Sequence, residues 1–194
     1  MTLIHLSAEE KSLILEIITF IIPFLLGLFA SMFIDILRSY KKISRNKKFI
    51  KLYLKDVILE VLPKLESAYT LVKKKTNQYE LSFFSLPAFE NFNTNVLNGI
   101  KPVDYYEIFK DKYVILDEII TMIKYISEKL PAEMHKDYYE FINNHLIEED
   151  KKGDIEHVKT CDICIIRKSG FVSTIDSRID EINQLKQLIE QLIK

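Results

Sequence analysis

The chain has 194 residues, of which 28% are charged, and its formal net charge is −1. That near-neutral balance disfavours nucleic-acid binding, which relies on Lys and Arg to neutralise phosphates. Only four glycines and five prolines punctuate the sequence, and alternation of the strand type is hard to find. We therefore expect long helices rather than a sheet.

Residues 17–34 are eighteen consecutive positions without an ionisable side chain, between Glu16 and Asp35. At a rise of about 1.5 Å per residue, such a helix spans roughly 27 Å, close to the hydrocarbon thickness of a bilayer. The segment is apolar on all sides, which suits lipid better than a two-sided globular environment. We predict a single transmembrane helix at residues 17–37, preceded by a short extracytoplasmic tail at residues 1–16.

Two alternatives explain this segment less well. A secretory signal carries positive charge before its apolar core and a small-residue cleavage site after it. Here the flank is acidic, with Glu9, Glu10 and Glu16 against Lys11, and the core is longer than that of a usual signal. Of these two alternatives to a transmembrane helix, a buried helix of a soluble protein is the stronger one.

Small residues recur inside the predicted span. Thr19, Pro23, Gly27 and Ser31 follow at intervals of four, a spacing that lets helix backbones approach closely, as in G-x-x-x-G pairs. Against this, the row drifts round the helix by about 40° per step, and Gly and Pro are common in membrane helices in any case. We predict that the row is a helix–helix interface through which the chain forms a homo-oligomer.

Basic residues crowd the segment after the span. They are Arg38, Lys41, Lys42, Arg45, Lys47, Lys48, Lys51 and Lys55, with no acidic residue among them. Because Lys and Arg concentrate on the cytoplasmic side, the N-terminus is predicted to lie outside the inner (plasma) membrane and the C-terminal part in the cytoplasm. Residues 38–56 should form a basic juxtamembrane helix that contacts anionic lipid headgroups, at about 1 kcal/mol per residue, through Arg38, Lys41, Lys42, Arg45, Lys47 and Lys48.

Residues 57–194 are predicted to form a cytoplasmic antiparallel helical bundle, so the fold class is all-α. The first helix should continue out of the membrane to about residue 75 and kink at Pro63, which removes a backbone donor. A second helix should run from Pro102 to about residue 130. Its inward stripe is Tyr106, Phe109, Tyr113, Leu116, Ile120, Ile123 and Leu130. That of the first helix is Ile50, Leu54, Val57, Val61, Leu65, Ala68 and Val72.

Three further helices complete the expected bundle. One opens at Pro131 and faces inward with Met134, Tyr138, Phe141 and His145. An acidic break at residues 148–153 separates it from a helix at residues 154–167 that ends near Gly170. The last helix should begin at Ser173 or Thr174, either of which can cap it, and its inward residues are Ile175, Ile179, Ile182, Leu185, Ile189 and Leu192.

Aromatic residues crowd the segment 79–101, where they are expected to fill an end of the bundle rather than bind a ligand. They are Tyr79, Phe83, Phe84, Phe89 and Phe92. A kinked anchor helix, a Leu86–Pro87 pair with spaced Phe89 and Phe92, and a helix carrying a tyrosine together resemble uncharacterised bacterial single-pass membrane-anchored helical proteins over residues 17–125. The resemblance implies an architecture and brings no activity or functional residue with it.

Cys161 and Cys164 form a C-x-x-C with His157 four residues before it. Zinc needs four such ligands, and no second Cys/His pair stands out; a thioredoxin-like site needs a βαβ context. In a helix over 154–167, Ile155, Val158, Cys161 and Ile165 would share a face, so we interpret Cys161 as a small buried hydrophobe. Convergence of both cysteines and His157 with another His or carboxylate would contradict that interpretation.

Motifs that carry chemistry are absent from the sequence. Four scattered glycines cannot form a phosphate-binding loop, and no H-E-x-x-H, G-x-S-x-G or EF-hand loop occurs. Asp176, Asp180 and Glu181 are expected on an exposed face of the last helix. We therefore expect no catalytic residues, no metal ligands and no cofactor, and a protein that is not an enzyme.

The function expected from these features is docking or assembly: a membrane-anchored, self-associating helical protein that holds a cytoplasmic protein partner at the inner membrane. One alternative is an oligomerising membrane effector that perturbs the bilayer on a cytoplasmic signal. A second alternative is a membrane-tethered enzyme, which would need a cluster of convergent polar groups in the bundle.

Overall fold

The computed structural model describes residues 8–80, 86, 89, 97 and 102–194. All of the elements found in these ranges are helices. The chain divides into two compact units, Met1–Asn46 and Lys47–Lys194. We call the second one the helical unit. Pro87 and Phe92, on which the resemblance partly rests, and Phe83 and Phe84 lie outside the described residues.

Helix α1 runs from Ala8 to Tyr53 and so supplies the long N-terminal helix that the sequence predicts. It contains an 18-residue window with a mean hydropathy of 1.9, long and apolar enough to cross a membrane, and no part of that window is buried. Its large apolar side chains between Ile21 and Leu37 are between 43% and 67% exposed. Such a surface is costly in water, because each large apolar side chain left exposed forgoes about 1.5 to 3 kcal/mol of burial.

A π-helical turn, η1 (Leu54–Ile58), joins α1 to helix α2 (Leu59–Asn77). The buried residues Ile50, Leu54, Ile58 and Leu62 recur at intervals of four, a spacing that drifts round an α-helix by about 40° per step. The wider π turn absorbs this drift and keeps all four on one side. The predicted stripe placed Val57 and Val61 inward, but both are only half-buried because of this shift.

Helix α2 continues through Pro63, the residue at which the sequence predicts a kink, and the π turn η1 precedes it. Pro63 is exposed, and its missing N–H leaves one carbonyl of the preceding turn without a helical partner. A separate departure from α-helical hydrogen bonding lies at residues 54–58. The end of the helix near residue 75 is as predicted, with Lys74 and Lys75 in the last turn of α2.

The predicted second helix is two helices in the structure. Helix α4 (Pro102–Phe109) and helix α5 (Tyr113–Ser127) are joined by the short 3₁₀ helix η2 (Lys110–Lys112). Lys110 has a positive φ of 45°, which breaks the helical path. Tyr106 and Tyr113, predicted to face inward, are 61% and 42% exposed. Their rings pack edge to face instead, with centroids 5.3 Å apart, while Phe109, Leu116, Ile120 and Ile123 are buried as expected.

Helix α6 (Pro131–Glu148) opens at the predicted proline. Met134 and Tyr138 are buried as predicted, whereas Phe141 is 37% exposed and Ile142 and Leu146 take the core positions. The turn after α6 carries positive φ angles at Asp150 (54°) and Gly153 (78°). This turn leads into the six-residue helix α7 (Ile155–Thr160), whose N-terminus is capped by the Asp154 carboxylate at 3.0 Å from the His157 amide.

Helix α8 (Asp162–Ile193) corrects the prediction for the C-terminal region. The sequence placed a break at Gly170 and a new start at Ser173 or Thr174, but α8 passes through all three residues. The break lies instead at Cys161, whose backbone is extended (φ −74°, ψ 123°). Five of the predicted inward residues are buried, namely Ile175, Ile182, Leu185, Ile189 and Leu192, and Ile179 is only partly buried. Their burial keeps the helix continuous through Gly170.

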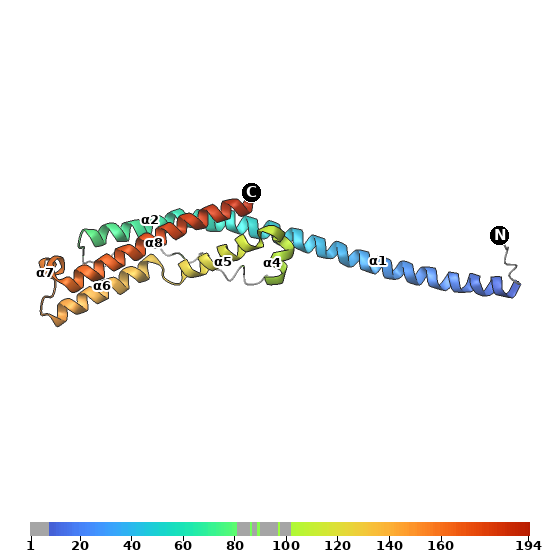
Figure 1. The fold of residues 1–194 in the computed structure, drawn as a ribbon, viewed down its shortest axis with the longest axis horizontal. Coiled ribbons are helices and arrows are strands. Elements are labelled where there is room, and N and C mark those ends of the chain that lie inside the picture. The colour runs from blue at the N-terminus through green and yellow to red at the C-terminus, as the bar shows by residue number, and fades with distance from the viewer. Residues whose placement is uncertain (1–7, 81–85, 87–88, 90–96, 98–101) are drawn as a thin grey trace. The chain divides into compact units, whose positions relative to one another are not determined.

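The core of the helical unit lies along α8, which packs against both α2 and α5, while α2 also contacts α6. Figure 1 shows α2 beside α8, with α5 and α6 in succession along the unit. No basic residue stands in the last turn of α8. Two lysines from other elements provide the positive charge there: Lys51 donates to the carbonyl of Ile193 at 2.6 Å and Lys112 to that of Gln191 at 3.0 Å. These cations stabilise the negative, C-terminal end of the helix dipole of α8.

Candidate functional site

The small residues of the predicted membrane interface all lie on the exposed surface of the first unit. Thr19, Pro23, Gly27 and Ser31 are exposed. A Cβ atom built on Gly27 would meet nothing within 4 Å. A Cβ atom at Gly27 therefore has room within the chain.

The six basic residues predicted to contact lipid headgroups are at least partly exposed as well. Arg38 lies 3.8 Å from the Asp35 carboxylate, in a pair whose side chains are 78% and 70% exposed; such a pair adds little to stability. In the helical unit, the Lys47 ammonium lies 5.7 Å from the ring centroid of Phe109. The cations thus remain accessible to anionic groups from outside the chain.

A cluster of His and Cys side chains forms where α6, α7 and α8 meet. His145 comes from the last turn of α6, His157 from α7, and Cys161 from the junction between α7 and α8. The three ligand atoms, one ring nitrogen from each histidine and the Cys161 sulfur, all lie within 4.8 Å of one another. His145 Nε2 and Cys161 Sγ are 3.3 Å apart, and the two imidazole centroids are 5.8 Å apart.

Cys161 is the N-cap residue of α8, and Cys164 lies in the first turn of that helix. The backbone N–H of Cys164, and then the His145 side chain, donate to the Cys161 sulfur and lower the pKa of its thiol. Cys164 is fully buried. Burial raises the pKa of the Cys164 thiol to about 11, with a further contribution from its hydrogen bond to Cys161. The two thiols are therefore in contact but in unlike surroundings.

This arrangement contradicts our interpretation of Cys161 as a small buried hydrophobe on a helix face. Ile155 and Ile165, predicted to share that face, are 45% and 42% exposed, because the chain breaks at Cys161. Cys161 and His157 instead converge with a second histidine, His145, and Cys164 contacts Cys161. Sequence reasoning missed His145 because it lies on another helix; the spacing H-x11-H-x3-C-x2-C was the available signal.

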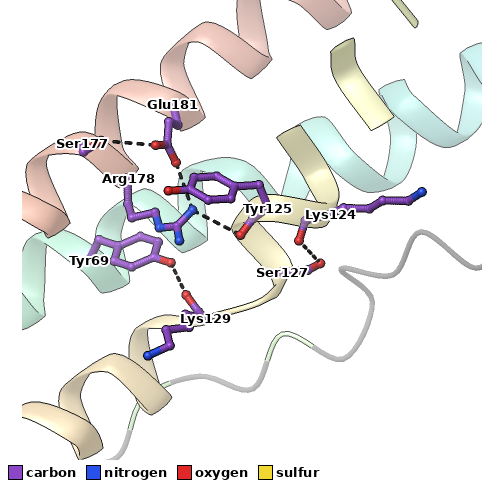
Figure 2. A network of polar contacts seen from close by, with 8 residues as sticks. All are labelled: Tyr69, Lys124, Tyr125, Ser127, Lys129, Ser177, Arg178 and Glu181. Atoms are coloured by element: carbon purple, nitrogen blue, oxygen red, sulfur yellow. Dashed lines mark hydrogen bonds and ion pairs between the residues drawn. The ribbon is translucent and has the colours of Figure 1, made fainter. Parts of the chain in front are cut away.

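Figure 2 shows a second polar cluster, centred on Arg178 of α8, which is 7% exposed. Its guanidinium donates to the Tyr125 carbonyl at 3.2 Å, pairs with Glu181 at 3.1 Å and lies 3.8 Å from the Tyr125 ring centroid. Nearby, the buried Tyr69 hydroxyl donates to the Lys129 carbonyl at 2.8 Å. Both buried polar groups are bonded to protein atoms: Arg178 ties α8 to α5, and Tyr69 ties α2 to the turn between α5 and α6. The cluster therefore holds the core together rather than presenting free groups to a ligand.

The same cluster corrects the prediction for the acidic residues of α8. Glu181 is not simply on an exposed face: its side chain is 22% exposed and is held by Arg178 and Ser177. Asp176 pairs with Lys73 of α2. Asp180 is exposed, as the sequence predicts. Comparison with protein-family models, curated proteins and solved structures finds no match to this chain.

Proposed function

We propose that the protein is a membrane-anchored docking or assembly protein. In this proposal α1 crosses the inner membrane with the N-terminus outside, and the helical unit is an antiparallel bundle in the cytoplasm that holds a protein partner near the bilayer. The observation that supports it is the 18-residue apolar window of α1, none of which is buried, in a chain whose helical unit has a separate, well-buried core. A chain that buries its core elsewhere has no internal use for this surface.

The basic segment supports the proposed orientation. Its lysines and arginines come directly after the apolar stretch, as in the cytoplasmic flanks of membrane helices. Anionic headgroups would then lie beside Arg38, Lys41, Lys42, Arg45, Lys47 and Lys48. Each favourable contact would contribute about 1 kcal/mol of binding free energy, which would hold the start of the helical unit near the membrane surface.

Self-association through Thr19, Pro23, Gly27 and Ser31 belongs to the same proposal. It also provides the route to the alternative function, an oligomerising effector that perturbs the bilayer, because both would use one small-residue face. The two functions differ in the consequence of assembly: a docking protein leaves the membrane sealed, and an effector does not.

Induced expression of the intact chain and of Gly27→Leu separates the two functions. A Cβ atom at this position meets no atom of its own chain within 4 Å, and Leu favours the helix more than Gly does, so a loss of oligomer would report packing between helices. The docking proposal predicts an unchanged membrane potential in both strains, with a smaller crosslinked oligomer fraction for Gly27→Leu. Ion leakage by the intact chain that disappears in Gly27→Leu would refute docking and support the effector.

Phe29→Leu is the matched control for that experiment. Phe29 is exposed in the same span, 64% of its surface being accessible, but it lies outside the small-residue row. Both substitutions leave an apolar residue in the span, so membrane insertion should be equal. An oligomer fraction that falls equally in both variants would contradict an interface through Gly27.

A further inference from the structure

We propose that His145, His157, Cys161 and Cys164 form a tetrahedral Zn²⁺ site that joins the end of α6 to the start of α8. This site is independent of the membrane function and replaces the expectation, drawn from the sequence, that the chain has no metal ligands. The donors are of the type that zinc prefers, two imidazoles and two thiolates. They come from three consecutive helices, which a single ion would hold together.

The spacing of the donor atoms fits such an ion. Zn–S bonds of about 2.3 Å and Zn–N bonds of about 2.0 to 2.1 Å place tetrahedral neighbours about 3.3 to 3.8 Å apart. His145 Nε2 and Cys161 Sγ are already 3.3 Å apart, and no pair among the three clustered ligand atoms exceeds 4.8 Å. Side-chain rotations that close the longest pair by about 1 to 1.5 Å would complete this part of the sphere.

The surroundings of His157 support a metal site independently of the donor spacing. Its Nε2 atom is buried and has no hydrogen-bond partner, although buried polar atoms are nearly always paired. The backbone of His157 is held by the Asp154 carboxylate, which accepts from its amide at 3.0 Å. A buried imidazole with an unsatisfied ring nitrogen, on a residue with a ligand atom within 4.8 Å of the Cys161 sulfur, suits a metal ligand.

Cys164 is the fourth ligand because of its place in the first turn of α8. Its side chain is fully buried and in hydrogen-bond contact with Cys161, so its sulfur already faces the cluster. The C-x2-C spacing across a helix start brings two sulfurs to one ion, as in structural zinc sites. The helix start also supplies backbone N–H groups that donate to the Cys161 sulfur, a common support for metal-bound thiolates.

Charge and proton balance favour a doubly charged ion. When Zn²⁺ binds, the two thiols lose their protons to solvent and the histidines bind as neutral imidazoles, so the completed site has no net charge. A neutral centre is compatible with its position beside the buried cluster of Tyr138, Ile142, Leu146 and Val158, where an uncompensated charge would be costly. The ion would fix α7, a helix of only six residues, between its longer neighbours.

The test uses the full chain, purified in mild detergent with a reductant that does not bind metal. We expect one Zn²⁺ per chain by elemental analysis and release of about two protons per ion at a pH below the thiol pKa values. With Co²⁺ as the probe, thiolate charge-transfer bands and the visible bands of tetrahedral Co²⁺ should appear. Their absence from the intact chain would overturn the proposal, whatever the variants do.

Variants assign the ligands. His157→Gln and Cys161→Ser should each weaken Zn²⁺ binding by about 100-fold or more, whereas His135→Gln should leave it unchanged. His135 is the matched control because it is a buried histidine on the same helix as His145 but lies outside the cluster. Circular dichroism of each variant checks the fold. Equal Zn²⁺ affinity in the intact chain and in folded His157→Gln and Cys161→Ser would contradict the site.

A disulfide between Cys161 and Cys164 is the competing fate of the two thiols. Cells are lysed into a thiol-blocking reagent, and the blocked cysteines are counted by mass spectrometry. The zinc proposal predicts that both cysteines are recovered as free thiols after denaturation in a chelator. Recovery of most of the protein with a Cys161–Cys164 disulfide would assign the pair to redox chemistry and overturn the proposal.

Discussion

Replacing Tyr69 by phenylalanine should change the stability of the helical unit in a manner that depends on pH. The Tyr69 side chain is fully buried, and its hydroxyl donates to the Lys129 carbonyl at 2.8 Å. Near pH 8, the substitution removes this hydrogen bond and leaves the carbonyl with one partner fewer. The expected loss in the free energy of unfolding is about 1 to 1.5 kcal/mol.

The pKa of Tyr69 reverses this comparison at alkaline pH. Burial, partly offset by Arg178, raises the pKa to about 12 in the folded chain, against 10.0 for an ordinary tyrosine. At about pH 11 most unfolded chains have lost the proton while most folded chains keep it. Ionisation then favours the unfolded state, at a cost to folding of about 1.4 kcal/mol. The stability conferred by Tyr69 is complete below about pH 10 and is lost as the pH rises towards the folded-state pKa of about 12.

Phenylalanine cannot ionise, so the intact chain and Tyr69→Phe should become about equally stable near pH 11. Tyr138, whose pKa burial also raises to about 12, is present in both proteins and cancels in the comparison. Denaturant unfolding of the full chain in detergent, monitored by circular dichroism at about pH 8 and about pH 11, measures the difference. A stability difference that is the same at both pH values would refute the reasoning.

Three further predictions rest on the same structure. Arg178→Met should lower the free energy of unfolding by about 2 to 3 kcal/mol, because the Tyr125 carbonyl and Glu181 each lose a partner. The control Arg167→Met, at an exposed position, should lower it by less than about 1 kcal/mol. Equal losses in denaturant unfolding would contradict the role of Arg178. Residues 40–194 made alone should be soluble and strongly helical by circular dichroism, and a substantial β signal would refute an all-helical unit. A membrane-impermeant thiol reagent should not label Cys161 or Cys164 in intact cells but should label them after lysis and denaturation, while labelling of intact cells would reverse the proposed orientation.

The long helices of the helical unit could be predicted from the sequence because each one buries a stripe that keeps a helical period, and the apolar run of residues 17–34 predicted α1. Ile175, Ile182, Leu185, Ile189 and Leu192 are buried as their spacing indicates, and Pro102 and Pro131 open helices as expected. The residues at which the helices break were less predictable from the sequence. An isolated glycine costs a helix only about 1 kcal/mol, so the continuous buried stripe of α8 outweighs Gly170, and the break falls at Cys161 instead.

The His/Cys cluster could be predicted only in part. The C-x-x-C and His157 are visible along the sequence, but His145 joins them only because the turn after α6 reverses the chain. That turn depends on positive φ angles at Asp150 and Gly153. Aspartate is common in turns with or without a positive φ angle, so the residue type at position 150 does not by itself indicate this conformation. In the same way, the π turn at residues 54–58 results from core packing over several turns, which local propensity does not encode.

Membrane fractionation after gentle lysis tests the central claim most directly, since every part of the proposed function depends on α1 lying in the bilayer. The intact chain should sediment with membranes and resist an alkaline carbonate wash, whereas a chain lacking residues 17–37 should move to the supernatant. Recovery of the intact chain in the soluble fraction, with nothing bound to it, would contradict the account.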